Sequence, residues 1–132
     1  RSDMVLTPHP GEAAEMLKVS VKDIQKNRIE SAKALQKKYG CIIILKGNGT
    51  IICNKNDIYL CSSGGPELAV AGSGDILSGI IGSLIAQGLT PFDAAKTGVV
   101  IHSLAGEDFA NDVGKIGLAA GELIPYIRKF LN

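Results

Sequence analysis

The sequence predicts a layered α/β domain, on three observations. Residues 41–45 form a continuous apolar run rich in isoleucine, which is typical of a strand covered by helices on both faces. A long helical stretch precedes this run, and two short strands follow it. After residue 74 the apolar residues recur at helical spacing, and no further strand is expected. Since 132 residues suit one compact domain, residues 1–132 are expected to form a single unit.

The elements before this run are a strand and two helices. A strand is expected over residues 4–6, followed by a turn into a short helix over residues 10–17. A Ser-x-x-Asp pattern predicts the start of a second helix, which is expected to run unbroken over residues 20–39 and to end at Gly40. Its thin apolar stripe is interrupted by Arg28. Its many basic residues favour a solvated face over a site for an anionic partner.

The elements after the run are two short strands and three helices. Glycine-containing and asparagine-containing turns predict strands over residues 51–53 and 58–61. An apolar helix is expected from about residue 74 to Gly88. Thr90 has the character of an N-cap for the next helix, and a last helix is expected over about residues 118–131.

Composition excludes several functional classes. A net charge of +1 argues against nucleic-acid binding, which needs a basic excess. No apolar stretch approaches the ~20 residues of a membrane span, so a soluble protein is expected. Cys41, Cys53 and Cys61 form no CxxC pair and predict small buried side chains, without a disulfide or a metal site. Free thiols and the lack of a signal peptide predict a cytoplasmic protein.

The strongest local signal for chemistry is Gly72-Ser73-Gly74-Asp75, which runs directly into an apolar helix. The first N–H groups of a helix lack internal partners, and the helix dipole attracts anions to that end. Glycines let a phosphate approach the backbone closely. The carboxylate of Asp75 would accept a proton from a hydroxyl beside that phosphate. The pattern fits phosphoryl transfer to an alcohol, and it fits an ordinary helix cap equally well.

Two further turns carry residues suited to ligand binding. Prolines on both sides of His9 restrict the backbone, which lowers the entropy lost when the imidazole is held towards a ligand. The other turn follows the buried strand and offers an ammonium group and backbone N–H groups; it consists of Lys46, Gly47, Asn48, Gly49 and Thr50. Each turn also has a plain structural interpretation, His9 as a helix cap and residues 46–50 as a hairpin turn.

Together these motifs resemble the signatures of the NAD(P)H-hydrate dehydratases, the ribokinase-like YjeF C-terminal domains that repair hydrated nicotinamide cofactors. The matching segments are residues 6–12 (LTPHPGE), residues 45–50 (LKGNGT) and residues 65–75 (GPELAVAGSGD). The His-Pro-Gly-Glu turn is the most specific of them, because many ribokinase-like kinases share GxGD. The resemblance covers essentially the whole chain and implies a ribokinase-like α/β/α architecture.

The resemblance also implies roles for individual residues. His9 would contact the hydrated dinucleotide, and residues 46–50 would line the site for ADP or ATP. Gly72, Ser73 and Gly74 would hold the nucleotide's phosphates. Asp75 would deprotonate the hydroxyl of the hydrated ring, which would receive a phosphoryl group and then lose phosphate to restore NADH or NADPH. Mg²⁺ is expected to accompany the nucleotide, held by phosphate and water, because no carboxylate cage is visible in the sequence.

The chain departs from the family pattern in its length. Domains of this family are much longer, and their first strands have no counterpart in this chain, so we expect only the C-terminal half. Without those strands, an apolar face is expected to be exposed where they would pair. A homo-oligomer, or association with a chain that supplies the missing half, is expected to cover this face. Two rival hypotheses are a kinase for a small molecule such as a vitamin precursor, using the same Asp75, and a non-catalytic nucleotide-binding half of a split enzyme.

Overall fold

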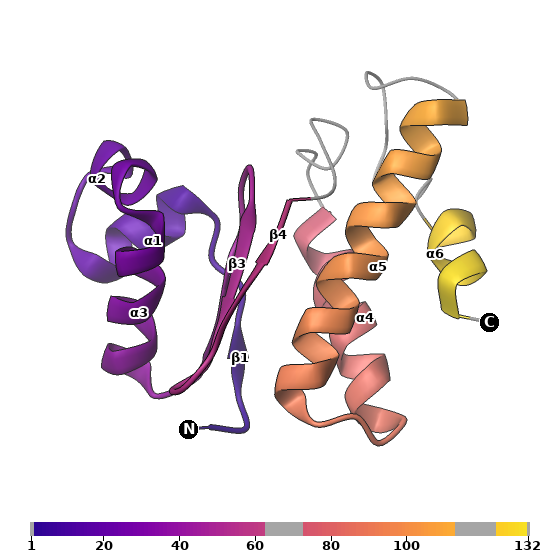
Figure 1. Cartoon of the computed structure of the whole chain (residues 1–132), viewed down its shortest axis with the longest axis horizontal. Helices are drawn as coiled ribbons and strands as arrows, with labels where there is room; N and C mark the ends of the chain where they lie inside the picture. Colours follow the sequence, from indigo (N-terminus) through magenta and orange to yellow (C-terminus); the bar gives the residue numbers. More distant parts are fainter. Residues whose placement is uncertain (1, 63–72, 113–123, 132) are drawn as a thin grey trace.

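A four-stranded sheet lies between two layers of helices (Figure 1). The structure, a computed structural model, describes residues 2–62, 73–112 and 124–131. On one side of the sheet lie α1 (Pro10–Leu17), α2 (Val21–Lys26) and α3 (Arg28–Tyr39). On the other side lie α4 (Ser73–Ala86), α5 (Pro91–Asp112) and α6 (Ile124–Leu131). The predicted α/β/α layering is confirmed.

The strands follow one another across the sheet in chain order. They are β1 (Val5–Leu6), β2 (Ile42–Leu45), β3 (Thr50–Cys53) and β4 (Ile58–Cys61). The pair β1–β2 is parallel, because α1 to α3 form a crossover connection between these strands. The pairs β2–β3 and β3–β4 are antiparallel and are joined by short turns. All four strands were predicted from the sequence.

The sheet is buried on both faces at its centre. Alternate residues of β2 and β3 contribute to two separate hydrophobic cores. Ile43, Leu45, Ile51 and Cys53 face α1 to α3. Ile42, Ile44 and Ile52 face α4 and α5. This alternation explains why the sequence of β2 is apolar at every position, and the predicted cover on both faces is confirmed. The three cysteines are free and buried, as predicted.

The predicted continuous helix over residues 20–39 is wrong, because it is broken at Asn27. Ser20 caps α2 in a capping box with Asp23, as predicted. Asn27 then leaves the helical conformation (φ −131°, ψ 57°), and its side-chain amide donates to the carbonyl of Asp23. Such local bonds of asparagine compete with the helical ladder. The break makes Arg28 the first residue of a new helix, which ends at Gly40 as predicted.

The helices of the second layer largely match the prediction. The amide of Asp93 donates to Oγ1 of Thr90 over 3.2 Å, which confirms Thr90 as the cap of α5. Helix α6 occupies the second half of the last predicted helix, and residues 113–123 lie outside the described residues. Within the described ranges, no helix is both long and apolar enough to cross a membrane.

Candidate functional site

The histidine turn, residues 8–12, connects β1 to α1. The amide of Glu12 donates to Nδ1 of His9 over 3.2 Å, and the amide of His9 donates to Oε1 of Glu12 over 3.1 Å. These reciprocal bonds form a capping box at the start of α1, so the helix-cap interpretation of His9 is confirmed. The His9 side chain nevertheless remains 58% exposed. The ring has room for this position because residue 11 is glycine, since a Cβ there would lie only 2.9 Å from the ring.

The lysine turn, residues 46–50, connects β2 to β3. Gly47 and Gly49 have φ angles of 142° and 80°, which residues with a Cβ rarely adopt. The hydroxyl of Thr50 donates to the carbonyl of Gly47 over 3.3 Å and closes the turn. The amide of Lys46 donates to the carbonyl of Pro8 over 3.0 Å. This last bond joins the lysine turn to the histidine turn.

The start of α4 lies against the lysine turn. An ideal Cβ built on Gly74 would lie only 2.7 Å from Nζ of Lys46, so the ammonium group fills the space left by the missing side chain. Asp75 is exposed in the same first turn of the helix. Ser73 begins α4, whereas Gly72 lies outside the described residues. The structure therefore places Lys46 of one predicted motif against Gly74 of another, next to Asp75 in the chain.

Electrostatics at this end of the molecule favour an anion. The aligned peptide dipoles make the start of α4 positive, and the Lys46 ammonium adds a full positive charge beside it. Among the residues that the structure describes, Lys46 forms no ion pair that would neutralise this charge. Two positive groups placed in contact repel one another unless an anion lies between or beside them. A phosphate group would bring negative charge and acceptor atoms to the described part of this arrangement.

A cavity at the end of β2 away from the lysine turn contains none of the predicted site residues. It has a volume of about 470 Å³ and is lined by Ser2, Gln36 and residues 40–42, 54–56 and 90–92. Residues 40–42 lead into β2, whereas the lysine turn follows its last residue. Residues 90–92 lie beyond the far end of α4 from Gly74, at the lower end in Figure 1. The candidate site is therefore the surface around Lys46 and Gly74, and this cavity is separate from it.

The family model of the NAD(P)H-hydrate dehydratases matches residues 1–129. The chain belongs to this family. The resemblance predicted from the three motifs is thereby confirmed.

Members of the family cover the chain over its whole length. The bifunctional NAD(P)H-hydrate repair enzyme Nnr of Coxiella burnetii is 45% identical over 133 aligned positions, which include 100% of this chain and 27% of that enzyme. The ADP/ATP-dependent NAD(P)H-hydrate dehydratase of Bacillus subtilis, co-crystallised with ATP and Mg²⁺ and soaked with CoA, is 34% identical with a TM-score of 0.91. That match covers 96% of this chain and 47% of the solved one.

A ribokinase-like protein of Enterococcus faecalis has the same fold. It is 28% identical to this chain, with a TM-score of 0.76, over 96% of this chain and 44% of its own. This likeness confirms the ribokinase-like architecture. The chain spans about half or less of the length of the relatives it matches.

Sequence patterns predicted no role for Arg28, yet it lies directly behind the lysine turn. Its guanidinium donates to the carbonyls of Leu45 and Gly49. One signal in the sequence pointed to it, because Arg28 interrupts the apolar stripe of its helix. A half-buried cation needs acceptors, and these acceptors belong to a turn 17 to 21 residues away.

The described residues contain no cluster of three or more His, Cys, Asp or Glu side chains that would hold a metal ion. In the described part of α4, the acidic residue of the first turn is Asp75. One carboxylate fits a magnesium ion that is bound mainly by phosphate oxygens and water, since Mg²⁺ commonly keeps several waters in its shell.

Proposed function

We propose that this chain forms the nucleotide-binding and catalytic part of an ADP- or ATP-dependent NAD(P)H-hydrate dehydratase, a repair enzyme for hydrated nicotinamide cofactors. The observation that carries the proposal is the contact of the Lys46 ammonium with Gly74 at the start of α4. This contact creates an anion site beside the carboxylate of Asp75. Membership of the dehydratase family supplies the reaction for which such a site is suited.

The proposed reaction is a phosphoryl transfer followed by an elimination. Asp75 accepts the proton of the hydroxyl on the hydrated nicotinamide ring while that oxygen attacks the terminal phosphorus of the nucleotide. The nucleotide leaves with one phosphate fewer. The ring carbon–oxygen bond then breaks, phosphate departs with the bonding electrons, and a proton leaves the neighbouring carbon to restore the double bond. Phosphate is a much better leaving group than hydroxide, which is the purpose of the first step.

The remaining site residues hold the reactants in place. Lys46 and the backbone N–H groups at Gly47, Asn48 and Gly49 bind the nucleotide, and Thr50 closes their turn. Gly72, Ser73 and Gly74 let its terminal phosphate approach the start of α4. Mg²⁺ would be held by the phosphates and by water, and would neutralise charge on the transferred group.

His9 is proposed to have two tasks. Its Nδ1 caps α1, and its exposed ring contacts the hydrated dinucleotide. The Lys46–Pro8 hydrogen bond keeps this ring on the same end of the molecule as the nucleotide site. The capping bond also favours the tautomer with its proton on Nε2, because Nδ1 acts as an acceptor.

The proposal also covers the rest of the domain, the oligomeric state and the cellular compartment. Residues 1–132 form one portion of a ribokinase-like domain, and the substrate pocket is completed by further residues of such a domain or by a partner. We expect a homo-oligomer or association with a chain of that kind. The three free, buried thiols suit a reducing compartment, so we place the protein in the cytoplasm.

The proposal is tested with the chain as part of the longer domain, or with the partner that completes its pocket, together with ADP or ATP and hydrated NADH or NADPH. Nucleotide binding is measured by calorimetry, and the reaction by the recovered absorbance of the reduced nicotinamide. Recovery of the absorbance supports the proposal. A phosphorylated product that accumulates would identify a kinase instead, and binding without turnover would identify a nucleotide-binding module.

Replacement of the proposed base gives the sharpest prediction. Asp75→Asn should lower turnover by about 100-fold or more, since general base catalysis typically contributes 10²- to 10⁴-fold. Nucleotide affinity should change little, because the backbone of the α4 start is unaltered. Asp93→Asn is the matched control, since Asp93 lies in the first turn of α5. Turnover that survives Asp75→Asn would remove this carboxylate from the mechanism.

A further inference from the structure

Arg28 contacts both ends of the lysine turn from behind. Its Nη2 donates to the carbonyl of Gly49 over 3.0 Å and to that of Leu45 over 3.4 Å. Its Nη1 donates to Oε1 of Gln25 over 2.8 Å, which fixes the orientation of the guanidinium plane. The carbonyls of Leu45 and Gly49 flank residues 46–48, the segment that includes Lys46. One side chain therefore spans the turn.

The turn is shaped to receive this guanidinium. A Cβ on Gly47 would lie 2.8 Å from Nη1 of Arg28, so the group packs against the bare backbone of Gly47. The φ angle of 142° at Gly47 also requires glycine. The glycine at this position thus serves two requirements at once, a backbone conformation and close contact with Arg28.

Arg28 stands where a cation is unfavourable for the stability of its own helix. It is the first residue of α3, at the positive end of the helix dipole. Burial lowers its pKa, and its three described acceptors are all neutral. No acidic side chain in the described ranges forms an ion pair with it. A second uncompensated cation therefore lies directly behind the turn that carries Lys46.

We propose that Arg28 is a positioning residue of the nucleotide site: it holds the lysine turn in the shape that keeps the Lys46 ammonium against Gly74. This inference rests on the proposed function for the identity of the ligand. It extends that function by a residue of α3, an element that carries none of the other site residues. Its charge adds to the positive potential that attracts the nucleotide's phosphates.

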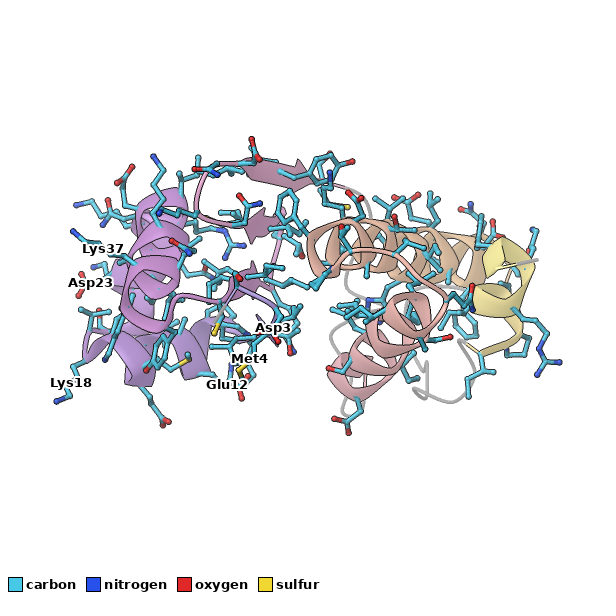
Figure 2. All side chains as sticks on the ribbon, turned by 90° about the horizontal axis from the view of Figure 1, so that it is seen from below. Asp3, Met4, Glu12, Lys18, Asp23 and Lys37 are labelled. Atoms are coloured by element: carbon cyan, nitrogen blue, oxygen red, sulfur yellow. The ribbon has the colours of Figure 1, made fainter. Side chains whose placement is uncertain are left out.

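The test compares Arg28→Met and Arg28→Lys with the control Lys37→Met. Lys37 is on the same helix and lies on its outer side, away from the sheet (Figure 2). Arg28→Met should weaken binding of ADP and ATP about 10-fold or more. Arg28→Lys should restore part of that affinity, because an ammonium group keeps the charge and donors but lacks the planar surface that packs on Gly47. Lys37→Met should bind as the unaltered chain does.

A second readout separates positioning from a general loss of stability and needs no ligand. NMR order parameters of the Gly47, Asn48 and Gly49 amides should fall from about 0.85 to below about 0.6 in Arg28→Met. The order parameters of the other amides in α3 and β2 should stay unchanged. If Arg28→Met does not fold, Arg28→Lys is judged on the same amides, where a smaller fall is expected.

The outcomes distinguish this inference from the proposed function. Unchanged nucleotide affinity and unchanged order in a folded Arg28 variant would overturn the role of Arg28 while leaving the nucleotide site intact. If the unaltered chain binds neither ADP nor ATP, the proposed function fails. In that case the order parameters still decide whether Arg28 holds the turn, with unchanged order overturning that role.

Discussion

The starts of α1 and α4 present opposite solutions to the same electrostatic problem. In both helices the first amide groups have no hydrogen-bond partner within the helix, and the helix dipole makes this end positive. At α1 the chain supplies its own acceptors, the imidazole of His9 and the carboxylate of Glu12. At α4 the chain places a further cation, Lys46, against Gly74. Among the described residues Lys46 has no ion pair, not even with Asp75.

Because of this difference, we expect the start of α1 to contribute to stability and the start of α4 to ligand binding. The capping box at α1 is complete without a ligand and contributes to the folded state at all times. The repulsion at α4 is relieved when an anion arrives, so the stabilising contacts form in the complex. Residues at the start of α1 should therefore affect unfolding more than affinity, and residues at the start of α4 should do the reverse.

The largest effect that tests this comparison is expected from Lys46→Met. Affinity for ADP or ATP should fall about 10- to 100-fold, because hydrogen bonds to charged groups contribute about 1.5–3 kcal/mol. The free energy of unfolding without nucleotide should stay constant or rise by up to about 1 kcal/mol, since a cation leaves a positive helix end. Calorimetry and urea unfolding measure the two quantities. A clear loss of stability with unchanged affinity would reverse the roles assigned to the two helix starts.

The sequence was sufficient to predict the layers and all elements except the division between α2 and α3. The apolar run of β2 predicted burial on both faces, and the structure divides its residues between two cores. The break at Asn27 was missed because the apolar and basic pattern continues across it. A side-chain bond from Asn27 to the Asp23 carbonyl ends α2, and nothing in the residue pattern distinguishes that asparagine from one on a helix surface.

The candidate site was predicted as three separate turns. Their motifs indicated the residue types, but the contacts between turns depend on how β2 is placed between β1 and β3. The proximity of Lys46 to Gly74 joins residues 28 positions apart and follows from the tertiary fold. Arg28 was missed for the same reason, since its two acceptors in the lysine turn are backbone carbonyls, which leave no trace in the sequence.

A smaller effect is expected from two substitutions of His9. His9→Ala removes the cap of α1 and should lower the free energy of unfolding by about 1 kcal/mol, within the usual range of 0.5–2 kcal/mol. His9→Asn should retain most of that stability, because asparagine is a good N-cap residue. Both variants remove the imidazole, so both should reduce turnover if it contacts the substrate. Full turnover in His9→Asn would leave this residue with the capping role alone.

The smallest predicted effect is the difference between alanine substitutions at two glycines of α4. Gly79→Ala should raise the free energy of unfolding by about 0.5–1 kcal/mol, because alanine favours the helix and its Cβ would meet nothing within 4 Å. Gly74→Ala offers a smaller helical gain, because Gly74 lies in the first turn, and its Cβ would occupy the position of the Lys46 ammonium. That flexible group would swing away at little cost in stability, and nucleotide affinity should fall several-fold in Gly74→Ala alone. Equal affinities in the two variants would mean that the contact between Lys46 and α4 does not serve the nucleotide, because only one of these alanines disturbs it.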